Sequence, residues 1–269
     1  MGLTLMKKTL PLCFFVALIA ACNSSEQDAP MRNEPVKNFP VPALIDNTPV
    51  TALPLGGSIR ALKTDADLGD PENAVWREAQ EYSMQLGLAP PVHPSINLRY
   101  DATAAAVPVF LRAATDGNNL YLRMRWADDS ENTATSREDF ADGAAVQFAL
   151  GDVASTSFMM GAANGPVNIW YWKAGQPRAQ NLAAGGFGST TRLEPADLNA
   201  SSMYRSSGEW LVVFSRPLQQ SGEHQVALVN DTAHMSFALW QGEQKQRDGL
   251  KHVSMGWVEL QLADTEPTL

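Results

Sequence analysis

The side chains with the most chemical potential concentrate in two segments of the chain. In the first, Met159 and Met160 precede a run that carries Trp170 and Trp172, and the second, about 80 residues later, carries Lys251. A thioether sulfur is a soft metal ligand, whereas an amine can ligate only after it loses its proton. Taken alone, these residues also fit ordinary roles, because methionine and tryptophan fill cores and most lysines are solvated.

The first residues have the pattern of a bacterial export signal. Lys7 and Lys8 form a short positive region, an apolar stretch (10–21) follows, and Cys22 comes directly after two alanines. The stretch is shorter than the roughly 20 apolar residues of a membrane span, so we expect a signal peptide, 1–21, that is removed. The alanine pair before Cys22 resembles the lipobox of bacterial lipoproteins, which implies lipidation of Cys22. Asn23 in place of aspartate favours the outer membrane over the inner one.

Cysteine and histidine offer little further chemistry. Cys13 lies inside the signal, so the mature chain keeps no free thiol for a disulfide, a thiolate metal site or a covalently attached haem. Four histidines are scattered without metal-ligand spacing: His93, His224, His234 and His252. The net charge is −9, and loss of two signal-peptide lysines lowers it to −11 with no basic run elsewhere. We therefore expect no nucleic-acid partner.

Short strands are expected to position these residues. Between Leu120 and Trp126, apolar residues alternate with Tyr121, Arg123 and Arg125, which predicts a half-buried strand. Similar runs, separated by turn-forming residues, occur at 107–113, 144–150, 167–173, 210–215, 235–240 and 257–262. The pattern predicts a mainly β fold, an antiparallel β-sandwich with a few short helices.

One helix and one tether complete the expected organisation. Asp70 can cap a helix over 71–86, with Trp76, Ala79 and Tyr82 on its buried side. Residues 22–57 are polar and rich in proline, which predicts a lipid-anchored tether, and 58–269 would form a single domain.

The two chemical segments together resemble a known family. In the first, Met160-Gly161 is followed by Val167-Asn168-Ile169-Trp170-Tyr171-Trp172-Lys173-Ala174. In the second, Trp240-Gln241-Gly242 is followed by Gly249-Leu250-Lys251-His252-Val253-Ser254. These motifs are similar to those of the haem b subunit, the gamma subunit, of ethylbenzene dehydrogenase and dimethylsulfide dehydrogenase. The likeness extends from about residue 61 to residue 262.

The resemblance implies a haem-binding β-sandwich with one non-covalent haem b. The family's methionine and lysine axial ligands fall on Met160 and Lys251, with Met159 as the alternative to Met160. Trp170 and Trp172 share a strand face and are expected either to contact the porphyrin or to lie in the core. Arg247 is a candidate partner of a haem propionate, with a solvated loop arginine as the alternative.

The implied function is electron transfer in the periplasm, by a protein without substrate chemistry of its own. Expected partners are molybdopterin and iron–sulfur subunits or a periplasmic cytochrome, with the membrane reached through the lipid. The alternative is a carbohydrate or small-ligand binding module that uses Trp170, Trp172, Trp240 and Trp257 as its platform. A purely structural envelope protein with all aromatic residues in its core is a third reading.

Overall fold

The structure is a computed structural model, and it describes residues 49–219, 222–229 and 232–262. The predicted signal peptide, Cys22 and most of the expected tether lie outside the described residues. Strand structure begins at Val50 and Leu53 is buried, so part of the segment predicted as tether packs with the domain.

Fourteen strands and two short helical turns make up the described chain. The helical turns are η1 (Ala74–Arg77) and α1 (Pro94–Asn97). The strands are β1 (Val50–Ala52), β2 (Ser58–Lys63), β3 (Glu81–Leu88), β4 (Val107–Thr115), β5 (Asn119–Ala127), β6 (Gly143–Ala149), β7 (Val167–Lys173), β8 (Gln180–Ala184), β9 (Thr191–Arg192), β10 (Asn199–Arg205), β11 (Glu209–Pro217), β12 (Thr232–Trp240), β13 (His252–Val253) and β14 (Val258–Gln261).

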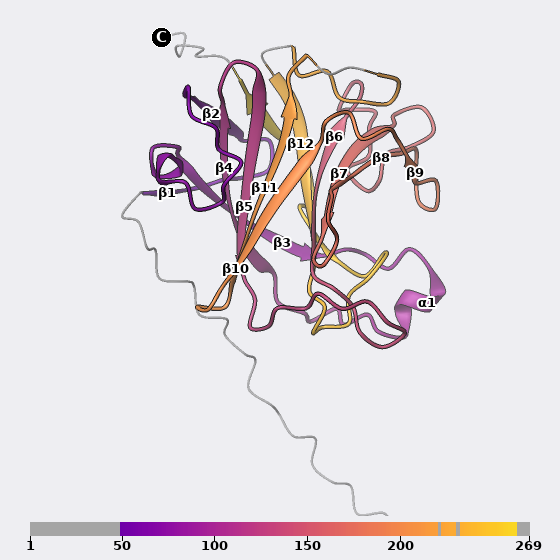
Figure 1. Ribbon diagram of the computed structural model, residues 1–269. Coiled ribbons are helices and arrows are strands. Elements are labelled where there is room, and N and C mark those ends of the chain that lie inside the picture. The colour runs from indigo at the N-terminus through magenta and orange to yellow at the C-terminus, as the bar shows by residue number, and fades with distance from the viewer. Residues whose placement is uncertain (1–48, 220–221, 230–231, 263–269) are drawn as a thin grey trace, which may run out of the picture. The chain divides into compact units, whose positions relative to one another are not determined.

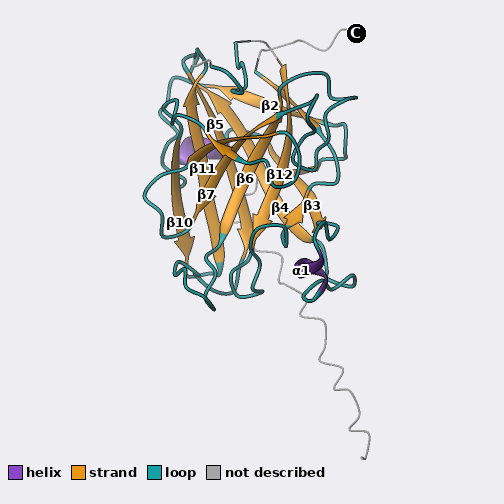
Figure 2. Cartoon of the chain, turned by 90° about the vertical axis from the view of Figure 1, so that its right-hand side faces the viewer, coloured by secondary structure: helices purple, strands orange, loops and turns teal. Residues whose placement is uncertain are grey.

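The strands form two facing layers, as Figures 1 and 2 show. One layer has the order β10-β11-β5-β4, and the other has the order β14-β12-β6-β7-β8-β9. They join along one side, where β2 pairs with β4 and β14 in parallel, and where β3 and β13 connect β4 to β12. Most other pairs are antiparallel, which confirms the predicted β-sandwich.

The main core fills the space between the layers. Trp126, Trp172 and Trp210 form an aromatic cluster there, with ring centroids 4.9–6.4 Å apart. All seven strands predicted from alternation are present, as β4, β5, β6, β7, β11, β12 and β14. No helix among the described residues is long and apolar enough to cross a membrane.

The prediction of a helix over 71–86 is wrong. Asp70 accepts a hydrogen bond from the N–H of Glu72 in a turn, and only η1 follows it. From Glu81 the chain is strand β3, which pairs antiparallel with β4 and in which Met84 and Leu86 are buried. The spacing of apolar residues that suggested a helix arises from a turn followed by a strand.

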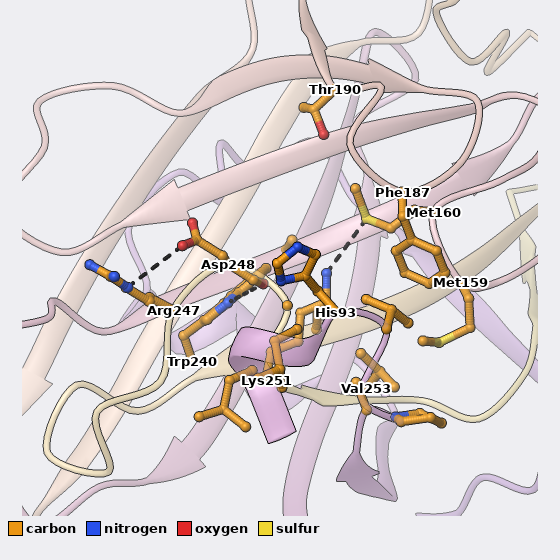
Figure 3. A pocket seen from close by; sticks show the side chains of 18 of the residues that line it. His93, Met159, Met160, Phe187, Thr190, Trp240, Arg247, Asp248, Lys251 and Val253 are labelled. Atoms are coloured by element: carbon orange, nitrogen blue, oxygen red, sulfur yellow. Dashed lines mark hydrogen bonds and ion pairs between the residues drawn. The ribbon is translucent and has the colours of Figure 1, made fainter. Parts of the chain in front are cut away.

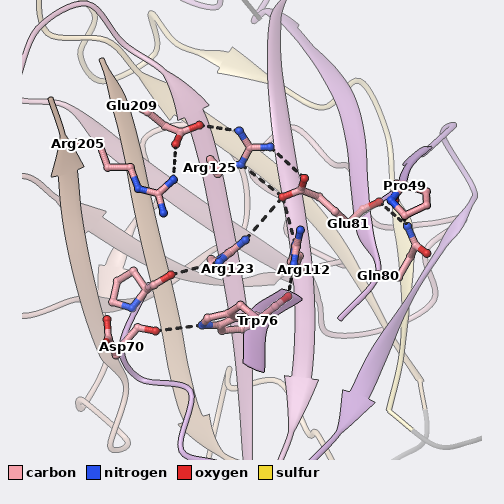
Figure 4. A network of polar contacts seen from close by, with 11 residues as sticks. Pro49, Asp70, Trp76, Gln80, Glu81, Arg112, Arg123, Arg125, Arg205 and Glu209 are labelled. Atoms are coloured by element: carbon pink, nitrogen blue, oxygen red, sulfur yellow. Dashed lines mark hydrogen bonds and ion pairs between the residues drawn. The ribbon is translucent and has the colours of Figure 1, made fainter. Parts of the chain in front are cut away.

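The expectation that β5 is only half-buried is also wrong. The segment that carries η1 covers its outer face, where Arg123 and Arg125 are buried together with Glu81 (Figure 4). Glu81 lies 3.0 Å from Arg125 and 3.2 Å from Arg112. Buried charges persist only when they are paired, and this network pairs them.

Candidate functional site

A cavity of about 1010 Å³ lies on the face of the β6, β7 and β12 layer that points away from the main core. Alternate residues of these strands form its floor, among them Ala145, Gln147, Ile169, Tyr171 and Ala238. The turn before β7, the loop after β12 and the segment around α1 form its walls. The volume is at the upper end of the range for small-molecule and cofactor sites, which is about 300–1000 Å³.

Met160 enters the cavity from the turn before β7. Its φ is 69°, in the left-handed region that L-residues with side chains rarely adopt, and Gly161 follows with φ 73°. At Gly161 a side chain would come within 2.8 Å of the oxygen of Gly165, so the turn requires glycine there. The N–H of Gly186 donates to the oxygen of Met160 at 2.8 Å and fixes the turn from the other side.

Lys251 enters from the loop between β12 and β13. Its Nζ lies 5.0 Å from the ring centre of Trp240, and its main-chain oxygen accepts a hydrogen bond from Ala89. Trp240 in turn donates its indole N–H to the oxygen of Asp248 in the same loop. Ile96 of α1 packs against Gly249, so α1 closes this loop from outside.

The two side chains meet inside the cavity. Lys251 Nζ donates a hydrogen bond to Met160 Sδ at 3.5 Å, across 91 residues of sequence (Figure 3). The lysine is 8% exposed, and this burial lowers its pKa to about 8, although the charge of Asp248 opposes the shift. The structure therefore brings a thioether and a readily deprotonated amine to one point.

Met159 also lines the cavity. Both methionines lie in a turn that precedes β7, so the alternation of side chains along a strand does not decide which of them faces the ligand. The two methionines differ in their contact with Lys251, which Met160 makes.

Trp170 and Trp172 face away from the cavity and do not line it. Both are buried in the main core, where Trp170 packs on Phe148 with centroids 4.6 Å apart. Strand alternation gives the cavity Ile169 and Tyr171 instead. Of the two alternatives for these tryptophans, the structure shows the position in the core. Neither ring is exposed for stacking on a sugar.

Arg247 lies at the mouth of the cavity. Its guanidinium is 4.8 Å from the ring centre of Phe140 and 3.6 Å from the carboxylate of Asp248, and its side chain is largely exposed. Arg99 also lines the cavity and lies 6.0 Å from the same ring. The mouth thus carries two guanidinium groups, one of which is paired with Asp248.

Sequence reasoning missed several lining residues, namely His93, Arg99, Gln147, Tyr171, Phe187 and Ser236. Tyr171 could have been found by applying strand alternation to the tryptophan-rich run from the other face. His93 carried no such signal, because α1 is an exposed turn with no apolar period. The described residues hold no group of three or more His, Cys, Asp or Glu side chains arranged to bind a metal ion.

Comparison with known proteins places this geometry in a family. Residues 73–195 match the family model described as ethylbenzene dehydrogenase. The chain is 40% identical over 219 residues to dimethylsulfide dehydrogenase subunit gamma of Rhodovulum sulfidophilum, covering 79% of this chain and 80% of that protein. It is 38% identical over 196 residues to chlorate reductase subunit gamma of Ideonella dechloratans, covering 72% and 80%.

More distant similarities extend the comparison. A putative respiratory nitrate reductase heme subunit of Haloferax mediterranei is 29% identical over 215 residues, 79% of this chain and 74% of that protein. Among solved structures, a putative carbohydrate-binding protein of Bacteroides uniformis is 11% identical and covers 77% of this chain and all of its own, with a TM-score of 0.48. A likeness that distant carries no argument about ligands. On the first two relatives, this chain belongs to the ethylbenzene dehydrogenase-related family of gamma haem subunits.

Proposed function

We propose that this protein binds one non-covalent haem b with Met160 and Lys251 as axial ligands and transfers single electrons in the periplasm. The observation that carries the proposal is the convergence of Met160 Sδ and Lys251 Nζ, 3.5 Å apart, in a cavity of about 1010 Å³. The name of the Haloferax relative, a heme subunit, supports the choice of cofactor.

The residues present fit such a cofactor. The floor between the two donors is mainly apolar, with Ala145, Ile169 and Ala238, which suits the face of a porphyrin. A soft thioether and a neutral amine would both ligate the iron strongly and leave it no open position. The bound group would supply a one-electron iron couple.

The contribution of Lys251 is to give up a proton. In the structure its Nζ donates to Met160 Sδ, and this hydrogen bond has to break before both atoms can turn to one ion. Burial lowers the pKa of Lys251 to about 8, so deprotonation near neutral pH costs much less than for a solvated lysine. The ring of Trp240 covers the amine and limits the access of water.

Arg247 is proposed to pair with a haem propionate. Its exposed guanidinium at the cavity mouth already holds a carboxylate, that of Asp248, at 3.6 Å. A propionate could take the place of this carboxylate, because guanidinium groups bind carboxylates with two parallel hydrogen bonds.

The relatives are named as gamma or heme subunits of oxidoreductases, which supports an electron-transfer subunit without substrate turnover. We therefore propose a molybdopterin subunit and an iron–sulfur subunit, or a periplasmic cytochrome, as partners. A lipid on Cys22 would hold the protein at the periplasmic face of the cell envelope, and Asn23 favours the outer membrane.

An absorption spectrum tests the proposal directly. Full-length protein produced with haem available should carry one haem per chain, with low-spin b-type bands and a haem that acid–acetone extracts. Protein that binds no haem, or that retains its haem after extraction, would refute it.

Ligand variants test the assignment. Lys251→Ala should lose the low-spin spectrum, and Lys251→Arg should fail equally because guanidinium stays protonated and has no lone pair to donate. Lys245→Ala is the control, since Lys245 is exposed and donates to the oxygen of Glu138. Because His93 lines the same cavity, Lys251→Ala is also combined with His93→Ala, which prevents replacement by imidazole. If the double variant keeps the wild-type spectrum, Lys251 is not the ligand.

A further inference from the structure

The cavity floor contains one buried amide that its apolar surroundings do not explain. Gln147 projects from β6 into the cavity, between positions occupied by apolar residues, and is 7% exposed. Burial of an amide is unfavourable unless it is hydrogen-bonded. Its Nε2 donates to the main-chain oxygen of Phe158 at 2.8 Å and to Ser236 Oγ at 3.0 Å.

Phe158 lies two residues before Met160, in the turn that delivers the thioether. In that turn Met160 and Gly161 are consecutive left-handed residues, a conformation that is unfavourable for the side chain of Met160 and persists where the surroundings hold it. Within the turn, the N–H of Gly161 donates to the oxygen of Ser157 at 2.9 Å. From outside the turn, the side chain of Gln147 donates to the carbonyl of Phe158, the residue directly before the two methionines.

Ser236 gives Gln147 a fixed direction. It lies directly opposite Gln147 on β12, and it is itself buried. One amide proton of Gln147 is thus bound to the sheet and the other to the turn. These two hydrogen bonds hold Phe158, and through it Met160, at a fixed position relative to the sheet that forms the cavity floor.

We propose that Gln147 is a positioning residue that sets where the thioether of Met160 lies relative to Lys251. This rests on the proposed function, because Met160 is taken as a ligand. Gln147 need not touch the cofactor for this role, since it acts through the carbonyl of Phe158. A purely structural glutamine would affect stability without changing the Met160 bond selectively.

The test compares Gln147→Leu with Gln85→Leu, the same change at an exposed position of β3. In haem-loaded full chain, Gln147→Leu should lose most of the near-infrared thioether-to-iron charge-transfer band and shift the reduction potential to a lower value. The Gln85 variant should match wild type in both. Gln246→Leu, which removes a buried amide bound to His252 beside Lys251, should leave the thioether band in place.

A second measurement needs no haem. With methyl-labelled methionine, the Met160 methyl resonance of the haem-free chain should shift in Gln147→Leu, and its contact with Lys251 should weaken. If Gln147→Leu does not fold, Gln147→Ala also lacks a donor for the oxygen of Phe158 and should give the same loss. A wild-type band and potential, or an unmoved Met160 methyl, in a folded Gln147 variant would overturn the proposal. If wild type itself shows no haem, the proposed function fails, and the methyl measurement still decides whether Gln147 positions Met160.

Discussion

The indole N–H of Trp257 donates a hydrogen bond to the main-chain oxygen of Thr156, 3.0 Å away. This bond joins the residue before β14 to the turn that carries Met160. Trp240 makes the corresponding contact on the lysine side, with the oxygen of Asp248. The two arms of the site are thus each held by a tryptophan through a main-chain carbonyl.

Trp257→Phe should keep the ring packing and remove this hydrogen bond, which is worth about 1 kcal/mol. We expect a loss of stability of that size in urea unfolding and faster transfer of haem to apomyoglobin. Trp240→Phe, which loosens the lysine loop instead, should also speed haem loss but should leave the Met160 methyl resonance in place. An unchanged rate of haem transfer from Trp257→Phe would show that the hydrogen bond from Trp257 to Thr156 does not stabilise the site.

The buried ion network of Figure 4 gives a prediction about stability alone. Glu81 is almost fully buried and lies within 3.7 Å of Arg112, Arg123 and Arg125. Glu81→Gln removes the shared carboxylate from three buried guanidinium groups and should destabilise the protein by about 3–5 kcal/mol. Urea unfolding would measure this.

The matched control is Glu72, whose exposed carboxylate lies 3.0 Å from Arg205. Glu72→Gln should cost less than about 1 kcal/mol, because solvent screens that pair. Equal losses in the two variants would contradict the role given to burial.

How far the sequence predicted the molecule depends on which patterns are local. Alternation along 120–126 predicted β5 correctly, because the two faces of a strand differ in polarity wherever one packs on the core. It could not show that Arg123 and Arg125 are buried, because the segment that covers them carries η1 and lies far before β5 in the sequence. The spacing of Trp76, Ala79 and Tyr82 suggested a helix because a turn followed by the strand β3 places apolar residues at helix-like intervals.

The candidate site was predictable in part. Motif resemblance identified Met160, Lys251 and Arg247, and all three line the cavity. The sequence left open whether Trp170 and Trp172 contact the porphyrin or lie in the core, because the motif does not say which strand face turns toward the core; both are buried in the core. Nothing in the sequence marks Gln147, because its hydrogen bond to the carbonyl of Phe158 forms only when the turn has folded.

The haem-free protein should become more stable as the pH rises from 8 to 10.5. Burial lowers the pKa of Lys251 to about 8 in the folded state, whereas the ordinary value is 10.5, so the unfolded state binds more protons between these values. The folded state carries a desolvated charge below that window and a neutral amine above it. The gain is about 3 kcal/mol. Urea unfolding across this range should show the rise in wild type and not in Lys251→Leu; an equal rise in both would contradict it.

Replacement of Cys22 tests the proposed anchor. Cys22→Ser removes the thiol that would carry the lipid, and each buried CH₂ of an acyl chain contributes about 0.8 kcal/mol to membrane binding. We expect the variant to remain unprocessed or to leave the membrane fraction. Membrane fractionation and processing identical to wild type would reject the lipoprotein hypothesis.

The last prediction separates the two methionines. Met160 contacts Lys251 at 3.5 Å, whereas Met159 shares only the cavity wall. Met160→Ala should therefore leave the haem held by Lys251 alone, with loss of the thioether charge-transfer band and a lower reduction potential, because a thioether favours the reduced iron. Met159→Ala removes the same number of atoms from the same turn and should keep both. Since a thioether carries no proton, the Met160 bond should also resist mild acid that converts the haem to high spin by protonating Lys251. Loss of the band in Met159→Ala, with its retention in Met160→Ala, would transfer the ligand role to Met159.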